Sequence, residues 1–107
     1  MAAKNPIVIC TFRVKPGKEP EFRELLDRHW PTLNRLGLVA PEPRMILRGA
    51  GKGNDGDLVE IFAWKGNSHE IAHTLPDVRA IWGPMETLCE TRGGRPAMEF
   101  PHFEPIG

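Results

Sequence analysis

This 107-residue sequence lacks several features that would point directly to a partner or a compartment. Its two cysteines, Cys10 and Cys89, are too few for a disulfide framework and stand in apolar surroundings, so we expect buried, reduced thiols in a cytoplasmic protein. The formal net charge is zero, which provides no electrostatic attraction for nucleic acid or an acidic lipid surface. No apolar run approaches the length that spans a bilayer. Nucleic acid and membranes are therefore not expected partners.

What the sequence does contain is two stretches that are apolar at nearly every position, residues 7–12 and 58–64. Such runs are typical of strands in a sheet that is covered on both faces. The sequence supplies two helical segments, enough to cover one face only. A second copy of the chain is the simplest cover for the other face, so we predict a homodimer.

The order of the elements predicts the fold. A strand over 7–14 leads through a Pro-Gly turn into a helix that ends at Gly37. Strands over 43–49 and 58–64 follow. The second helical segment begins as a short helix with Ser68 as its cap, restarts at Pro76, and leads to a proline-interrupted strand over 97–103. We predict a single domain, residues 1–107, of the α+β class: a ferredoxin-like βαββαβ fold with an antiparallel sheet. The first helix has one apolar face, formed by Phe22, Leu25, Leu26, His29, Leu33 and Leu36.

The two faces of the strand over 58–64 differ in character. Alternation places three small side chains on one face, and these are predicted to pack under the helices: Val59, Ile61 and Ala63. The other face carries bulky side chains and one carboxylate: Leu58, Glu60, Phe62 and Trp64. We interpret this second face as the lining of an enclosed ligand space, because pockets are mostly apolar with a few placed polar groups. The alternative is a plain dimer interface with Glu60 ion-paired across it.

Two longer segments carry a resemblance to a known family. The stretches VEIFAWKGNSHEIAHTLPDVRAIWGPMETLCE and RPAMEFPHFEPI resemble the dimeric α/β-barrel superfamily, in particular its small antibiotic biosynthesis monooxygenase-like members. The resemblance implies that two protomers pair their sheets into a barrel and that each protomer keeps a pocket between its sheet and its helices. By position it implies that this pocket is bordered by Glu60, Trp64, His73, Trp82 and Glu86. The superfamily also holds isomerases and haem-degrading enzymes, so fold alone does not fix the reaction.

The function implied is a cofactor-independent monooxygenase-like enzyme acting on a small aromatic metabolite, with no cofactor and no metal. Glu60 and His73 are the candidate catalytic residues, since an imidazole titrates near neutrality and a carboxylate can orient it or take a proton itself. The candidate substrate-binding residues are Trp64, Trp82, Glu86, His29 and Phe62. His29 lies on an apolar helix face, where a core imidazole is the alternative interpretation. The rival function is a non-catalytic small-ligand-binding or dimerisation module.

Two other patterns have specific alternatives. His69-Glu70-Ile71-Ala72-His73 matches the zinc-protease pattern, with Glu90 as a possible third ligand. Its helix is short and stops before Pro76, so we favour the barrel interpretation. Arg13, Arg44 and Arg48 stand on predicted strands. They are expected to be solvated, although a carboxylate-bearing ligand would find partners there.

Overall fold

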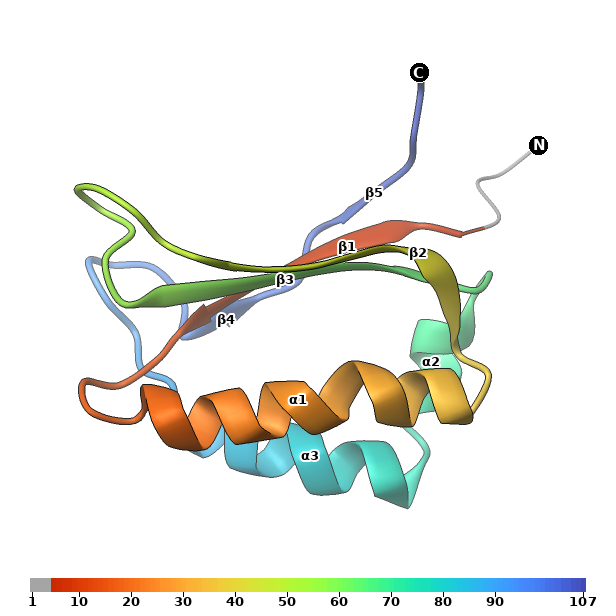
Figure 1. Ribbon diagram of the computed structural model, residues 1–107, viewed down its shortest axis with the longest axis horizontal. Coiled ribbons are helices and arrows are strands. Elements are labelled where there is room, and N and C mark those ends of the chain that lie inside the picture. The colour runs from red at the N-terminus through yellow and green to blue at the C-terminus, as the bar shows by residue number, and fades with distance from the viewer. Residues whose placement is uncertain (1–4) are drawn as a thin grey trace.

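The computed structural model describes residues 5–107; residues 1–4, which belong to the predicted domain, lie outside the described part. Its strands and helices follow one another in the predicted order (Figure 1). The strands are β1 (Ile7–Arg13), β2 (Val39–Arg48), β3 (Asp57–Trp64), β4 (Met98–Glu99) and β5 (His102–Phe103). The helices are α1 (Glu19–Arg35), α2 (Ser68–Ala72) and α3 (Pro76–Thr87). None of the helices in residues 5–107 is long and apolar enough to cross a bilayer.

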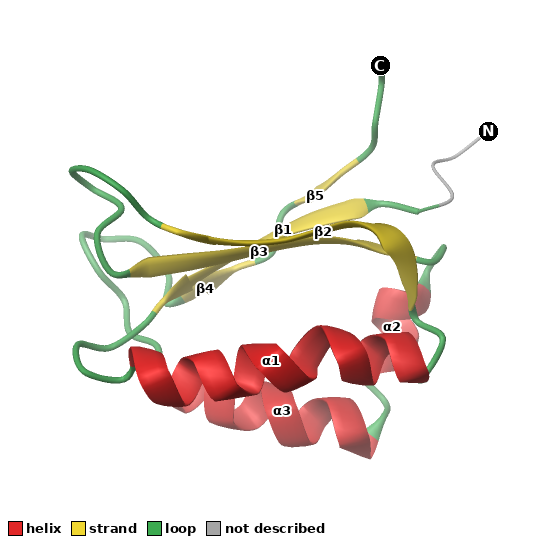
Figure 2. Ribbon diagram, viewed as in Figure 1, coloured by secondary structure: helices red, strands yellow, loops and turns green. Residues whose placement is uncertain are grey.

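The strands form one antiparallel sheet in the order β2-β3-β1-β4, with β5 also pairing with β1. This strand order and element sequence confirm the predicted α+β, ferredoxin-like topology. The helices lie together on one side of the sheet and the other side is bare (Figure 2). The hydrophobic core therefore fills the single layer between sheet and helices, where the buried residues of α1 meet those of β1 and β3.

The local sequence explains most element boundaries. Helix α1 has Glu19 and Glu21 in its first turn, where the positive end of the helix dipole favours acidic side chains. It ends before Gly37, whose φ of +76° suits a residue without a Cβ. The predicted serine cap of α2 is wrong: Ser68 lies inside the helix, and Asn67 precedes it without a side-chain capping bond.

Two strands also differ from their predicted limits. β2 begins at Val39 instead of residue 43, and its pairing with β3 shifts register between Val39 and Arg44. The last strand is divided into two short pieces around Phe100 and Pro101. Proline has no N–H to give to a ladder, so at Pro101 only its carbonyl is paired, accepting from the N–H of Ile9 on β1 at 3.1 Å.

The prediction of which face of β3 packs against the helices is wrong. The bulky side chains of Leu58, Glu60, Phe62 and Trp64 face the helices and are buried. Val59 and Ile61, predicted to pack under the helices, lie on the bare face and are half-buried. Alternation separates the two sets correctly, but it does not say which set faces the helices. Because Glu60 has none of its surface exposed and pairs within its own chain, the alternative of an ion pair across a dimer interface is also wrong.

The bare face of the sheet is apolar. Met45 and Leu47 of β2 lie opposite Ile61 and Val59 of β3 in the register, and they are 51% and 44% exposed. Phe103 of β5, opposite Ile7 of β1, is 51% exposed. A single copy of the chain therefore leaves one side of its sheet without cover, as the sequence predicts.

Candidate functional site

The centre of the candidate site is a hydrogen-bonded pair in the core. His29 of α1 and Glu60 of β3 lie 2.7 Å apart, from Nδ1 to Oε1. Their exposed fractions are 3% and 0%, so water does not screen the interaction. The pair forms because the apolar face of α1 lies on the face of β3 that carries Glu60.

Trp82 of α3 fixes the hydrogen positions of this pair. Its indole N–H donates to His29 Nε2 at 2.8 Å, so Nε2 must carry a lone pair. The proton of the neutral imidazole is then on Nδ1, where it is donated to the Oε1 atom of Glu60. The arrangement orients His29 as a base: the carboxylate holds one nitrogen, and the other nitrogen is an acceptor directed at α3.

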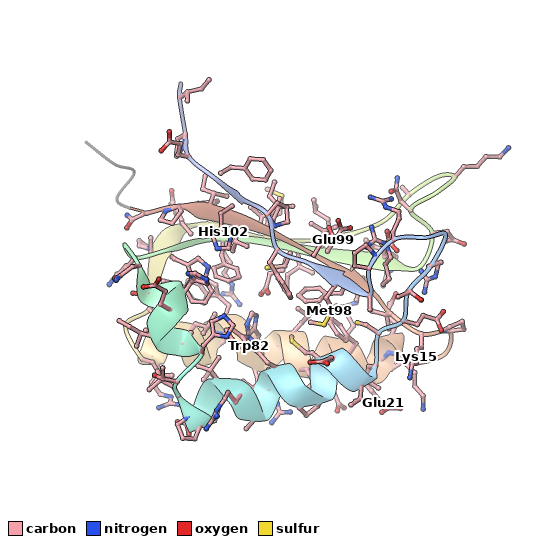
Figure 3. The ribbon with its side chains drawn as sticks, turned by 180° about the vertical axis from the view of Figure 1, so that it is seen from behind. Lys15, Glu21, Trp82, Met98, Glu99 and His102 are labelled. Atoms are coloured by element: carbon pink, nitrogen blue, oxygen red, sulfur yellow. The ribbon has the colours of Figure 1, made fainter. Side chains whose placement is uncertain are left out.

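The other three histidines continue this row toward the surface. The exposed ring of His73 lies 4.9 Å from the indole of Trp82, between ring centroids. His69 follows at 5.6 Å from His73, and His102 of β5 lies 5.1 Å from His69. Figure 3 shows Trp82 directed from α3 toward the sheet, below the segment that carries His102. All four histidines of the sequence thus lie along one path from the core to the surface.

Two aromatic side chains of β3 flank the path on the sheet side. The ring of Phe62 lies 5.8 Å from His29 and 5.0 Å from Trp64. Trp64 in turn lies 6.1 Å from His69. Both side chains are buried, and their edge-to-face packing holds the imidazoles in an apolar environment.

The local charge is negative. Cys10 of β1 is the register partner of Glu60, and burial together with the charge of Glu60 raises the pKa of its thiol well above the usual value. The second carboxylate oxygen of Glu60, Oε2, is buried and has no hydrogen-bond partner among the described residues. Buried polar atoms usually have a partner, so this oxygen marks a position where a donor is missing.

The arginines that were candidates for binding a carboxylate are already engaged. Arg48 pairs with Glu19, and Arg44 lies over the ring of Trp30 at 4.3 Å. Arg13 is 1% exposed and pairs with Glu99 at 2.6 Å. No cation of residues 5–107 other than His29, when it is protonated, pairs with Glu60.

Six of the seven predicted site residues lie along this one path: Glu60, His73, His29, Trp82, Phe62 and Trp64. The seventh, Glu86, is exposed on α3 and is not part of the hydrogen-bonded pair or of the row of rings. Glu60 is bonded to His29 and not to His73, which lies beyond Trp82. Sequence reasoning missed this pairing, and the only signal for it was an imidazole on an otherwise apolar helix face.

Open space lies elsewhere on the molecule. A groove of about 580 Å³ runs between α1 and α3 on their outer side, lined by Asp27, Arg28, Pro31, Thr32, Arg35, Asp77, Ala80 and Ile81. A second groove of about 260 Å³ lies nearby, along the other ends of the same helices. Neither borders Glu60 or His29. The Glu60–His29 pair itself is shielded from solvent.

The histidines of α2 do not assemble with the acid that was considered as a zinc ligand. Glu90 lies 3.5 Å from the guanidinium of Arg92, at the opposite end of α3 from His69 and His73. Within residues 5–107 no group of three or more histidine, cysteine or acidic side chains is arranged to hold a metal ion.

The comparisons with known proteins bear on the fold. No protein-family profile and no curated protein sequence matches the chain. Among solved structures, the cofactor-independent oxygenase SnoaB from Streptomyces nogalater superposes with a TM-score of 0.75 at 18% identity, covering 98% of this chain and 96% of that one. A protein from Caulobacter crescentus of the antibiotic biosynthesis monooxygenase type gives 0.67 at 14% identity, covering 98% and 92%.

A NIPSNAP family protein from Agrobacterium tumefaciens gives a TM-score of 0.65 at 12% identity, covering 99% of this chain and 90% of that one. Proteins with the same architecture therefore include an oxygenase and others named only by family. The chain has the α+β fold of the antibiotic biosynthesis monooxygenase-like proteins.

Proposed function

We propose that this chain is a cytoplasmic, cofactor-independent monooxygenase-like enzyme that acts on a small aromatic metabolite between its sheet and its helices. The observation that carries the proposal is the buried Glu60–His29 pair, whose outer nitrogen is an acceptor directed at α3. The similarity in fold to a cofactor-independent oxygenase supports the same reaction class.

The proposed chemistry begins with a proton transfer. His29 Nε2 takes the proton of a phenol-like substrate, and the charge of Glu60 stabilises the imidazolium that forms. The resulting anion is electron-rich and reacts with dioxygen directly. When a ring CH₂ becomes a ketone, one oxygen atom enters the substrate and the other leaves as water, so the substrate supplies all four electrons and no external reductant is required.

This scheme changes the roles that the sequence suggested. Glu60 remains the candidate carboxylate, and His29 replaces His73 as the imidazole next to it. His73, exposed and 4.9 Å from Trp82, is proposed to border the outer end of the site, and the proton that His29 takes returns in the water that leaves. Phe62 and Trp64 are proposed as the aromatic wall on the sheet side.

The second candidate function is a non-catalytic module that binds a small ligand or only dimerises. The closed state of the site favours it, because Glu60, His29 and Phe62 are at most 3% exposed and the two grooves lie on the outer side of the helices. Such a module needs no titrating pair, and removing Glu60 would then change stability without changing any reaction.

Oxygen consumption with a phenolic anthrone distinguishes the two functions. We expect uptake above the rate of autoxidation, and a decrease of about 10²- to 10⁴-fold in kcat for Glu60→Gln and His29→Gln, the usual range for loss of a general base. His102→Gln, which changes an exposed imidazole at the far end of the row, is the matched control and should retain most of the activity. A wild-type rate equal to autoxidation would favour the binding module.

We also propose that the protein is a homodimer that pairs the bare faces of two sheets. Support comes from the exposure of Met45, Leu47 and Phe103 on that face. Burial of apolar surface stabilises association by roughly 25 cal/mol per Å² before the entropic costs are subtracted. The helix-facing site lies on the other side of the sheet, so each protomer would retain its own Glu60–His29 pair.

A further inference from the structure

The acceptor nitrogen of the candidate base is already occupied by a donor from its own chain. The Nε1–H group of Trp82 lies 2.8 Å from His29 Nε2, which is where the hydroxyl of a substrate must be to lose its proton. Beside it, Oε2 of Glu60 is buried without a partner among the described residues. The core therefore presents two acceptor atoms: His29 Nε2 accepts from an indole N–H, and Glu60 Oε2 has no donor among the described residues.

The surroundings determine which ligands such a site accepts. The side chains that flank Glu60 in the sheet register carry no positive charge: Cys10 on β1, whose thiol pKa is raised, and Ile46 on β2. The arginines of β2 on this face are held by other groups, Arg44 by Trp30 and Arg48 by Glu19. An anion would meet a buried carboxylate with no cation to balance it, whereas a neutral donor finds an acceptor.

Trp82 is also placed where it can leave. It is half-buried, with the buried His29 on one side and the exposed ring of His73 on the other. Gly83 and Pro84 follow it inside α3. Pro84 has no N–H, so the carbonyl of Ala80 has no helical donor, and the turn that carries the indole is weakened.

We propose that Trp82 is a displaceable plug: a ligand with a neutral hydroxyl or N–H donor replaces the indole at His29 Nε2, and the departing ring frees space for an aromatic group of about its own size. This inference rests on the proposed function only in placing the ligand at the Glu60–His29 pair. It explains why a site with the groups of a base is closed in the free protein. It also makes Trp82 a specificity determinant, since a ligand must offer a donor that compensates for the lost indole bond.

Three probes with one ring system test the inference in the wild-type protein at pH 7: 1-naphthol, naphthalene and 1-naphthoate. We expect naphthol to bind about 3- to 10-fold more tightly than naphthalene, the range of one hydrogen bond, and naphthoate to bind more weakly than both. In ¹H–¹⁵N spectra, saturation with naphthol should move the indole N–H signal of Trp82 more than those of Trp30 and Trp64. Equal affinity for naphthol and naphthalene, or an unmoved Trp82 signal, would overturn the proposal.

A pair of matched variants tests the plug itself. Trp82→Phe removes the indole donor and keeps an aromatic ring, and we expect naphthol and naphthalene each to bind about 3- to 10-fold more tightly because no internal bond has to break. Trp30→Phe is the control, since the indole N–H of Trp30 is buried without a hydrogen-bond partner in the described chain. An equal gain in affinity from Trp82→Phe and Trp30→Phe would refute the proposed role of Trp82. If naphthol displaces Trp82 but the phenolic anthrone gives no oxygen uptake above autoxidation, the proposed role of Trp82 stands and the proposed oxygenase is refuted. Oxygen uptake with the anthrone but no displacement of Trp82 by naphthol would refute the role of Trp82 and leave the oxygenase standing.

Discussion

His29 and Glu60 are 31 positions apart in the sequence and share a 2.7 Å hydrogen bond in the core, with neither side chain more than 3% exposed. A carboxylate in such a place loses its hydration and must be compensated by what surrounds it. One oxygen of Glu60 has His29, and the other has no partner within residues 5–107. The core at this point is organised around an incomplete polar network, which costs stability and is the kind of feature that a binding site retains.

The first prediction concerns the tautomer of His29. Because Nε2 accepts from Trp82 and Nδ1 donates to Glu60, His29 should be the Nδ1–H tautomer at neutral pH. Long-range ¹H–¹⁵N correlation spectra report the tautomer of each histidine directly. The Glu60→Gln variant should preserve it, since a Gln carbonyl also accepts from Nδ1–H, and an Nε2–H tautomer in the wild-type protein would contradict the hydrogen-bond pattern.

The second prediction concerns the stability of the same pair. His29→Leu leaves a buried carboxylate without its partner and should lower the free energy of unfolding by about 3–5 kcal/mol. Glu60→Leu leaves only a neutral donor unpaired and should cost about 1–3 kcal/mol. The double variant should be more stable than His29→Leu alone, because it removes the orphaned charge. Urea unfolding of the four proteins measures the coupling, and strictly additive losses would mean that the two residues do not interact.

The sequence predicts the fold here because its strongest signals are local. The three- and four-residue spacing of Phe22, Leu26, His29 and Leu33 defines the buried face of α1, and the positive φ of Gly37 is needed where that helix ends. The antiparallel order follows from the succession of strands and helices. The helix signals lie within one or two helical turns, and the order of the elements is read directly along the sequence.

The site was harder to predict because it is made of contacts between distant segments. Alternation along β3 groups Glu60 with Phe62, but the side on which the helices pack is decided by the whole sheet. The sequence suggested that Glu60 orients His73 or takes a proton itself, and the imidazole that it contacts is that of His29. That pairing depends on how α1 lies across β3, which no pattern within either element contains.

The third prediction concerns the ion pairs at the end of the sheet near residue 57. Asp57 is 5% exposed and lies 3.2 Å from Arg92, with the buried Arg13 at 4.0 Å. Asp57→Ala should lower the free energy of unfolding by about 3–5 kcal/mol, because two guanidinium groups lose a buried counter-charge.

The matched control is Glu21→Ala, which removes the exposed pair between Glu21 and Lys18. Exposed pairs one helical turn apart contribute about 0.3–0.5 kcal/mol. Thermal or urea unfolding of both variants gives the comparison. Similar small losses in the two proteins would show that the Asp57 cluster is as well solvated as the surface pair.

The fourth prediction tests the proposed homodimer. Leu47→Lys places a charge on the bare sheet face, on the edge strand β2, and should shift the protein to monomer at micromolar concentration in sedimentation velocity. Ile71→Lys makes the same chemical change on α2 at a residue with nearly the same exposure, 47% against 44%. The control variant should remain dimeric. A wild-type protein that is already monomeric at this concentration would refute the proposal.

The fifth prediction follows from the environment of Cys89. Burial raises the pKa of its thiol from about 9 to about 11, and the nearby Arg92 and Lys15 offset part of that rise. The unfolded chain therefore loses this proton at lower pH than the folded chain does. The stabilisation is complete below about pH 9 and is lost as the pH rises through about 11.

Cys89→Ala isolates this contribution, because the variant has no thiol to titrate and keeps every other group, including Cys10. The free energy of unfolding of the wild-type protein should fall more steeply than that of Cys89→Ala between pH 9 and pH 11, and the two profiles should run parallel below pH 8. Urea titrations across this range measure the difference. Parallel profiles up to pH 11 would mean that the thiol ionises equally easily in both states, and hence that water reaches Cys89 in the folded protein.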